Sequence, residues 1–357
     1  MRKMRKKKGK IVLIFVLILL IALVLSSLFY IFKNTSACGD GKKQEVLVIE
    51  EGESFDQVLQ NLEELNLIHS KEFASLYVKF KSNIQYYAGN YTLNDGMNLN
   101  EILNFLNDSS NATKESVTIT IPEGKWAKEI AEILSQQLDY SKEEIIAYWN
   151  DETNLKEWCN TYEFLNFDDI NQSVYKIKLE GYLFPETYSI EKDATLDAIT
   201  RTLLNQFDVM YQEYKDDFKN SDYSIHQIVT LASVVQFESG YDKDMPTIAG
   251  VFYNRLNNGM KMQSSVTVCY ALYDEFNDPK DCEVQTDIDS PYNTYLYDGL
   301  PAGPILNAGK DAFYAVLNPE ENDYFYFAAD IHGDGKVYYS KTYEEHLQIC
   351  EELNLGL

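Results

Sequence analysis

The sequence has few of the residues that bind metal ions. Only five of its 357 residues are cysteines and four are histidines. The cysteines form no CxxC pair and the histidines never fall at metal-ligand spacing, so nothing in the pattern supports a metal centre, and we expect no cofactor. Cys269 and Cys282 could pair in an oxidising compartment, but the odd total favours free cysteines acting as small core residues.

Positive charge is also scarce beyond the first ten residues. Seven of the 31 Lys and Arg residues lie in residues 1–10, which leaves 24 against 56 Asp and Glu and a net charge of about −32 for the rest. Such a surface repels phosphate backbones and anionic membranes, which argues against nucleic acid as a partner.

The chain has one long apolar run, Ile11 to Phe32, with 22 residues and no charge. This is enough to cross a bilayer, and it exceeds the ~7–15 apolar residues of a cleaved signal peptide. We therefore predict a single-pass cell-membrane protein with residues 1–10 in the cytoplasm and 33–357 outside. A lipoprotein with Cys38 as acceptor is disfavoured because Thr35 stands where a large aliphatic residue is expected.

After a polar linker at 33–45, a pattern of β-branched run, Glu-Gly turn and amphipathic helix occurs at 47–66 and again at 117–138. Residues 88–106 predict another strand, turn and helix. The sequence thus predicts an α+β protein, with small β-α modules over 46–154 and a mixed α/β domain over 155–357. The modules could be a folded spacer or a LysM-like carbohydrate-binding unit.

Two carboxylates lie in LEGYLFPETYSI, at Glu180 and Glu186. A structural role in holding a turn is favoured over catalysis for both. Residues 194–218 carry apolar side chains at helical spacing and predict a long amphipathic helix.

The next helix contains the stretch LASVVQFESG at residues 231–240. Ser224 followed by Gln227 fits a capping box at its start, and Gly240 is typical of the position just past a helix end. Glu238 follows the apolar positions 231 and 235 on one helix face.

A carboxyl group at the position of Glu238 can serve as an acid catalyst. Lost hydration and the helix C-terminus both favour its protonated form, which can donate a proton and afterwards act as a base. Periodicity alone leaves the alternative open that the helix surfaces at Glu238, which would then be solvated.

Several motifs together resemble one family. LASVVQFESGYDKDMPTIAGVFYNRLNNGMKMQSSVTVCYAL and SPYNTYLYDGLPAGPILNAG, preceded by IPEG, AGNYTL and LEGYLFPETY and followed by YFYFAAD, are similar to the YceG-like (MltG) family of endolytic murein transglycosylases. With the apolar run, the resemblance extends over nearly all of residues 11–355. It implies a peptidoglycan lytic transglycosylase anchored in the membrane, with a LysM-like N-terminal region.

The resemblance assigns catalysis to the second Glu of an E-x-E-[TSAG] stretch, which is Glu238 here, whereas the first Glu is replaced by Gln236. One carboxylate suffices for this chemistry. It would protonate the oxygen between N-acetylmuramic acid (MurNAc) and N-acetylglucosamine (GlcNAc). It would then take the proton of the MurNAc 6-hydroxyl, which closes a 1,6-anhydro ring.

The resemblance also implies residues that bind the glycan. The family's LQTDPTV reads MQSSVTV here, so that Ser265 and Val266 replace Asp and Pro, and Ser265 could bond a sugar hydroxyl. SPYNTY could instead be a packing turn, and GLPAGPI has a glycine at a point of close approach. The predicted substrate-binding residues are Gln263, Ser265, Tyr292, Asn293, Tyr295 and Gly303.

Two other functions remain open. A hydrolytic muramidase would pair Glu238 with a second carboxylate such as Glu186 or Asp287. A non-catalytic wall-binding scaffold is the other alternative, because the motifs depart from the family at Gln236 and Ser265. The expected partners are nascent peptidoglycan strands and cell-wall synthases at the membrane.

Overall fold

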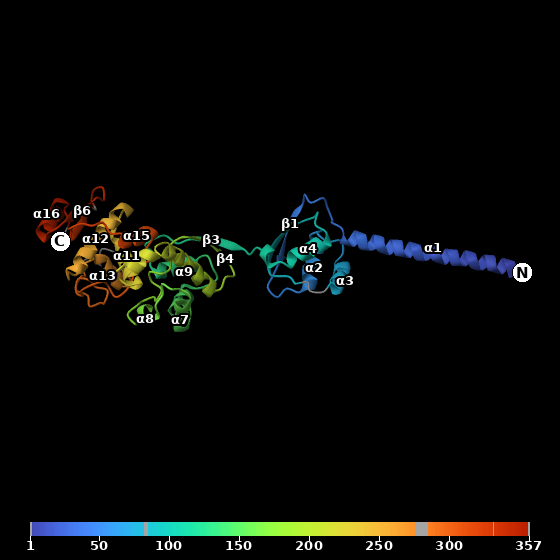
Figure 1. Cartoon of the computed structure of the whole chain (residues 1–357), viewed down its shortest axis with the longest axis horizontal. Helices are drawn as coiled ribbons and strands as arrows, with labels where there is room; N and C mark the ends of the chain where they lie inside the picture. The colour runs from blue at the N-terminus through green and yellow to red at the C-terminus, as the bar shows by residue number, and fades with distance from the viewer. Residues whose placement is uncertain (1, 82–84, 276–284, 331, 356–357) are drawn as a thin grey trace. The chain divides into compact units, whose positions relative to one another are not determined.

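The protein is described from a computed structural model, which covers residues 2–355 except 82–84, 276–284 and 331, with side chains from residue 13 onward (Figure 1). The chain divides into two compact units, Met1–Glu115 and Ser116–Leu357. Within the described ranges the strands form three separate two-stranded antiparallel sheets, and most other elements are helices. The predicted α+β class is therefore confirmed.

The first unit begins with a long apolar helix. Its segment Leu13–Thr35 is long and apolar enough to cross a membrane, and every residue from 13 to 33 is exposed, whereas Asn34 is buried. The elements of this unit are α1 (Arg2–Thr35), β1 (Gln44–Ile49), α2 (Phe55–Glu64), α3 (Lys71–Phe80), β2 (Gly89–Asn94), α4 (Leu99–Leu106) and a 3-10 turn, η1 (Ser109–Asn111).

A small core holds the first unit together. Strands β1 and β2 pair with Leu47 opposite Tyr91, and both side chains are fully buried against α2 and α4. The turn before α2 places Gly52 at φ 79°, and Ser54 caps the helix by accepting from Gln57 N–H. The strand–turn–helix pattern predicted at 47–66 and the strand and helix predicted at 88–106 are confirmed.

The second unit carries the larger core. Its elements are β3 (Ser116–Thr120), α5 (Ala127–Ser135), α6 (Lys142–Asn150), α7 (Glu152–Thr161), α8 (Phe167–Ile170), β4 (Thr187–Glu191), α9 (Leu196–Glu213), α10 (Lys215–Asn220), α11 (Ile225–Glu238), η2 (Asp242–Asp244), α12 (Met245–Asn257), α13 (Ser265–Leu272), α15 (Lys310–Leu317), β5 (Tyr326–Ala329), β6 (Val337–Ser340) and α16 (Tyr343–Glu352). The predicted helix over 194–218 is interrupted at Tyr214, between α9 and α10.

The second unit starts earlier than the boundary at 154/155 expected from the sequence. Strand β3 pairs with β4, with Ile119 opposite Tyr188, and the side chains of α5 and α6 enter the same core as those of α11. Because these contacts join residues far apart in the chain, the second strand–turn–helix copy belongs to the larger unit. The LysM-like character of 46–154 stays a prediction.

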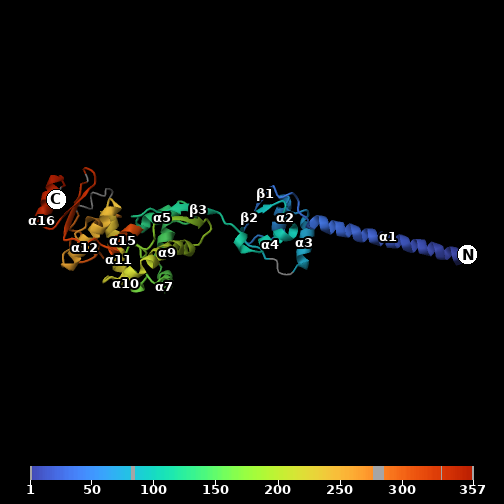
Figure 2. The same cartoon turned by 45° about the horizontal axis from the view of Figure 1, so that its top comes forward.

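Helix α11 lies in the middle of the second unit and contacts α12, α13 and α15 (Figures 1 and 2). Every residue from Ile228 to Val235 is buried, so the helix is enclosed on all sides there instead of along one stripe. The end of such a helix reaches solvent only where neighbouring elements leave it uncovered.

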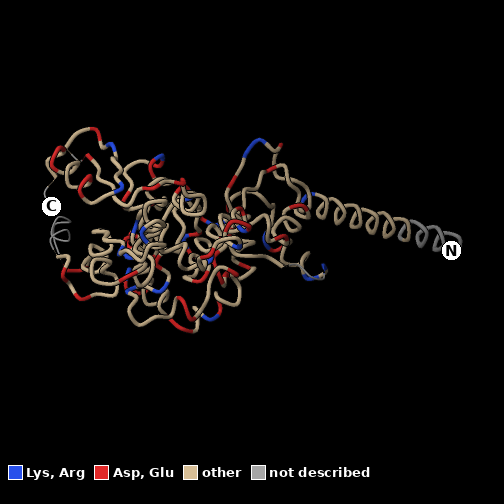
Figure 3. Tube along the Cα trace, turned by 60° about the vertical axis from the view of Figure 1, so that its left-hand side comes forward, with Lys and Arg blue, Asp and Glu red and all other residues tan. Residues whose placement is uncertain are grey.

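Charge and cysteine chemistry differ between the parts of the chain. Asp and Glu residues occur at many places along the trace, whereas α1 carries no charged residue over the apolar run (Figure 3). Cys38, Cys159 and Cys350 are free, but Cys269 is disulfide-bonded, which corrects the expectation of free cysteines for this residue. Cys282 lies outside the described residues. A disulfide is typical of an oxidising, extracytoplasmic compartment.

Candidate active site

The candidate site lies at the C-terminal end of α11. The capping box at its start is as predicted, since Ser224 accepts from Gln227 N–H and the Gln227 side chain accepts from Ser224 N–H. The end differs from the prediction. The C-cap is Ser239 in an extended conformation, and Gly240 does not take a positive φ, so the helix lacks a left-handed glycine cap.

The Glu238 carboxylate is half-buried and has a defined partner. Its Oε1 accepts a hydrogen bond of 2.5 Å from the Ser264 hydroxyl. It is therefore neither surrounded only by apolar groups nor freely solvated, the two environments that the sequence left open. A hydroxyl at this place orients the carboxylate, because a charge-assisted hydrogen bond is short and directional.

Ser264 is itself fixed by buried hydroxyl groups. Its N–H donates to Thr294 Oγ1 at 3.0 Å, and Thr294 shares a further 3.0 Å bond with the hydroxyl of Thr267. All three residues are at most 3% exposed. Ser264 is the N-cap of α13, yet its hydroxyl makes no capping bond and turns to Glu238 instead. The oriented carboxylate thus depends on a network that joins α11, α13 and the SPYNTY turn.

A buried cation lies close to this network. Arg255 on α12 donates to the carbonyl oxygens of Phe325 and Met262, each at 2.5 Å, which fixes the loop leading to Ser264. Burial lowers the pKa of Arg255, and the nearby charges of Tyr326, Tyr295 and Glu238 act in the opposite direction. The sequence analysis did not single out Arg255, Ser264 or Thr294. The one feature that could have pointed to this network is the first serine of MQSSVTV, Ser264, whose hydroxyl can donate to a carboxylate.

Of the predicted substrate-binding residues, Gln263 and Tyr295 lie near this network. Gln263 is exposed and directly precedes Ser264, and its φ of 51° is unusual for a residue other than glycine. Its N–H donates to the Thr294 carbonyl at 3.1 Å. Tyr295 is partly exposed and interacts with the charge of Arg255. Strained backbone of this kind is common at functional sites.

Tyr292 and Asn293 serve packing in this structure. Asn293 is fully buried, and its amide donates to the carbonyls of Thr286 and Ile288. Tyr292 is 3% exposed with its ring 4.8 Å from that of Tyr270, and burial raises its pKa. These contacts agree with the packing-turn interpretation of SPYNTY for both residues.

Ser265 and Gly303 are the remaining predicted residues. Ser265 is the first residue of α13 and is partly exposed. Gly303 is buried, and a Cβ atom there would lie 2.8 Å from the Tyr175 ring. The close approach at Gly303 is therefore explained by packing within the protein. A substrate role for either residue stays a prediction.

Glu180 is a buried structural carboxyl group, as the sequence favoured. It is 3% exposed, and its oxygens accept from Ala127 N–H at 2.9 Å, the Asn307 amide at 2.9 Å and the Tyr270 hydroxyl at 3.1 Å. Burial raises the pKa of Glu180 to about 8. The next residue, Gly181, has φ 90°, and a Cβ there would meet Pro304 at 2.5 Å.

Other carboxyl groups lie away from Glu238 in the chain. Glu186 is exposed, directly precedes β4 and accepts a hydrogen bond from the neighbouring Thr187 N–H, and Asp287 is exposed. The sequence did not single out Glu123, whose carboxyl packs so tightly on Gly309 that a Cβ there would lie 2.0 Å from its Cδ. Burial, together with Asp311 and Asp242, raises the pKa of Glu123.

Gln236 has a structural role. Its Oε1 accepts from Gly309 N–H, the N-cap of α15, at 2.9 Å. We expect Gln236→Ala to lower the free energy of unfolding by about 1–2 kcal/mol, because Gly309 N–H loses its acceptor. Urea denaturation measures this. Gln236→Glu is the matched control, since it keeps an acceptor oxygen, and an equal loss in both variants would contradict this role.

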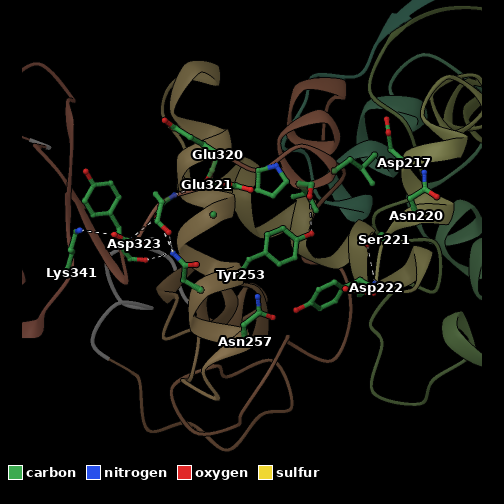
Figure 4. Close-up of a pocket in the computed structure, with 18 residues that line it drawn as sticks. Asp217, Asn220, Ser221, Asp222, Tyr253, Asn257, Glu320, Glu321, Asp323 and Lys341 are labelled. Atoms are coloured by element: carbon green, nitrogen blue, oxygen red, sulfur yellow. Dashed lines mark hydrogen bonds and ion pairs between the residues drawn. The ribbon is translucent and has the colours of Figure 1, made fainter.

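A separate groove of about 1220 Å³ lies on another face of α12 (Figure 4). Tyr253 and Asn257 line it from α12, with Asp217 and Asp222 on one side and Asp323 on the other. Arg255 is two residues from Tyr253, about 200° round the helix, so the groove and the Glu238 network use different sides of α12.

Among the residues that the structure describes, no group of three or more His, Cys, Asp or Glu side chains could hold a metal ion.

The sequence of this chain is similar to a known family and to individual known proteins. Residues 47–352 match the model of the YceG-like family. The chain is 35% identical over 316 residues to the endolytic murein transglycosylase of Bacillus subtilis, covering 88% of this chain and 86% of that protein. It is 33% identical over 347 residues to that of Streptococcus pneumoniae D39, covering 94% of this chain and 62% of the longer relative.

A solved structure is similar as well. The crystal structure of a yceG-like protein from Listeria monocytogenes superposes with a TM-score of 0.60 at 33% identity, over 86% of this chain and 99% of that one. The family model spans most of the chain and the relatives exceed 30% identity, and we conclude that this chain belongs to the YceG-like family.

Proposed function

We propose that this protein is an endolytic lytic transglycosylase that cleaves nascent peptidoglycan strands between MurNAc and GlcNAc. The observation that carries the proposal is the orientation of one half-buried carboxylate, Glu238, by the buried Ser264 hydroxyl. The names of the relatives, endolytic murein transglycosylase, support it.

The proposed reaction needs only this carboxyl group. Protonated Glu238 gives its proton to the glycosidic oxygen as the C1–O bond of MurNAc breaks, and GlcNAc leaves with a free hydroxyl. The carboxylate then takes the proton of the MurNAc 6-hydroxyl while O6 bonds to C1, which regenerates the acid without consuming water.

The helix α1 limits where this reaction occurs. We propose that Leu13–Thr35 is an uncleaved anchor with the seven basic residues of positions 1–10 in the cytoplasm. The site would then face newly made strands and the synthases that make them. A LysM-like region before the catalytic unit, and contacts of Gln263, Ser265 and Tyr295 with sugar hydroxyls and acetamido groups, belong to the same proposal.

The proposal is tested by mass spectrometry of uncrosslinked peptidoglycan strands digested by the full-length protein. Internal cleavage with 1,6-anhydro-MurNAc ends is expected. Reducing MurNAc ends would indicate hydrolysis with a second carboxylate, and unchanged strands would indicate a scaffold.

Neighbouring serines offer a matched pair for the role of Ser264. We expect Ser264→Ala to lower kcat by about 10- to 100-fold, because one hydrogen bond to a charged group contributes about 1.5–3 kcal/mol. Ser264→Thr keeps the hydroxyl and should retain most activity. We expect Ser265→Ala to leave kcat unchanged and to raise KM. Equal kcat losses in both alanine variants would show that the bond to Glu238 is not the cause.

A further inference from the structure

An aromatic cluster adjoins the end of α11 next to Glu238. Trp126, the N-cap of α5, has its ring centroid 6.5 Å from that of Phe237 at an interplanar angle of 72°, and 4.9 Å from that of Tyr273. We call these three residues the aromatic shelf. They come from three segments far apart in the sequence, and Phe237 directly precedes Glu238.

The shelf is fixed by its surroundings. The turn before Trp126 is bonded to Asn307 through Gly124 N–H and the Lys125 carbonyl, both at 3.0 Å. On the other side, the Lys128 ammonium lies 3.4 Å from the Tyr273 ring centroid and bonds the Tyr273 carbonyl at 2.9 Å. A surface held in this way loses little entropy when a ligand binds.

Two of the three shelf rings, Phe237 and Trp126, are more exposed than the core around them, whereas Tyr273 is only 8% exposed and supports them from below the surface. Phe237 is 39% exposed although α11 is otherwise enclosed from Ile228 to Val235. Among the three tryptophans, Trp149 and Trp158 are fully buried, and their indole N–H groups bond Thr200 and Asp197.

Trp126 is different: it is partly exposed, and its buried indole N–H has no acceptor among the residues described. An unpaired buried donor is a stability cost, which indicates that packing alone does not explain this residue.

We propose that the aromatic shelf is a subsite for one N-acetylated hexosamine unit of the glycan strand, next to the bond that Glu238 cleaves. This inference rests on the proposed function and deepens it. A pyranose ring presents an apolar C–H face, and aromatic rings bury such a face while leaving the hydroxyl groups solvated. A neutral sugar also avoids the repulsion that the strongly acidic chain imposes on anionic ligands.

The tryptophans provide a direct measurement of binding. Full-length Glu238→Gln protein in detergent would be titrated with uncrosslinked glycan strands from which the stem peptides have been removed. Binding should protect tryptophan fluorescence from acrylamide, and only Trp126 is accessible enough to report it. Trp126→Phe in the same background should abolish the protection while an independent binding measurement still detects the strand.

Substitution of Phe237 tests the subsite without removing the reporter. We expect Phe237→Ala to weaken strand binding about tenfold, and Phe237→Tyr to restore it, because the loss of one aromatic contact is of this size. Tyr314→Ala removes a comparably exposed ring on α15 and should bind normally. Circular dichroism would show that each variant is folded.

Two results would overturn the subsite while leaving the proposed reaction intact. One is a folded Phe237→Ala variant that binds the glycan strand with unchanged affinity. The other is acrylamide quenching of Trp126 fluorescence that the bound strand does not alter. Conversely, protection of Trp126 by a protein that forms no anhydro product would support the subsite and reject the proposed reaction.

Discussion

Replacing Glu238 with Gln is expected to lower the formation of 1,6-anhydro-MurNAc ends by about 10³- to 10⁴-fold, the upper range for one acid–base group. In the proposed reaction the same carboxyl group donates and later accepts the proton, and an amide can do neither. The fold should be retained, because the amide oxygen still accepts from the Ser264 hydroxyl. Quantitative mass spectrometry of digested strands measures the rate, and thermal denaturation checks stability.

Controls for this experiment are the other carboxyl groups. Glu186→Gln, Asp287→Asn and Glu123→Gln should each leave product identity unchanged and activity within about tenfold, since a single acid–base group is proposed. If one of them were as inactive as Glu238→Gln and the product of the native protein carried reducing ends, a two-carboxylate muramidase would replace our proposal. Full activity of Glu238→Gln would exclude Glu238 as the catalytic group.

Replacing Glu180 with Ala is expected to lower the free energy of unfolding by about 3–5 kcal/mol. The substitution removes the shared acceptor of Ala127 N–H, the Asn307 amide and the Tyr270 hydroxyl, and it leaves a cavity in the core. Glu180→Gln is the matched control. Its oxygen can accept from Ala127 and Asn307 while its amide donates to the Tyr270 oxygen.

The same residue predicts a dependence of stability on pH. Burial raises the pKa of Glu180 to about 8 in the folded protein, whereas an exposed glutamate titrates near 4.5. The stabilising contribution of Glu180 to the free energy of unfolding is therefore fully present below pH 4.5, and it is lost as the pH rises through 8. Relative to Glu180→Gln, the native protein should lose roughly 3–4 kcal/mol of unfolding free energy between pH 5 and pH 8.5.

Urea denaturation of both proteins at the two pH values measures this difference. A constant difference between them would show that Glu180 titrates alike in the folded and unfolded states, and a difference of opposite sign would mean that the buried carboxylate is charged and stabilised. Because the comparison is between variants, other titrating groups such as His226, whose pKa burial lowers, cancel.

Local patterns predicted most of the secondary structure. The strand–turn–helix segments and the capping box at Ser224 depend on residues close together in the chain, so the sequence contains the information that forms them. The long apolar helix and the family were recognisable for the same reason. Gly240 was misleading because Ser239 ends the helix in another way.

The sequence by itself thus determined the α+β class, the family and the position of Glu238 at a helix end. Only the tertiary structure decided what that carboxylate touches. Ser264, Thr294 and Arg255 reach the site through contacts between α11, α12, α13 and the SPYNTY turn. The tertiary structure also decided that β3 and α5 belong to the larger unit. The same packing places Trp126 beside Phe237. Such long-range contacts follow from packing of the whole core, which no local period encodes.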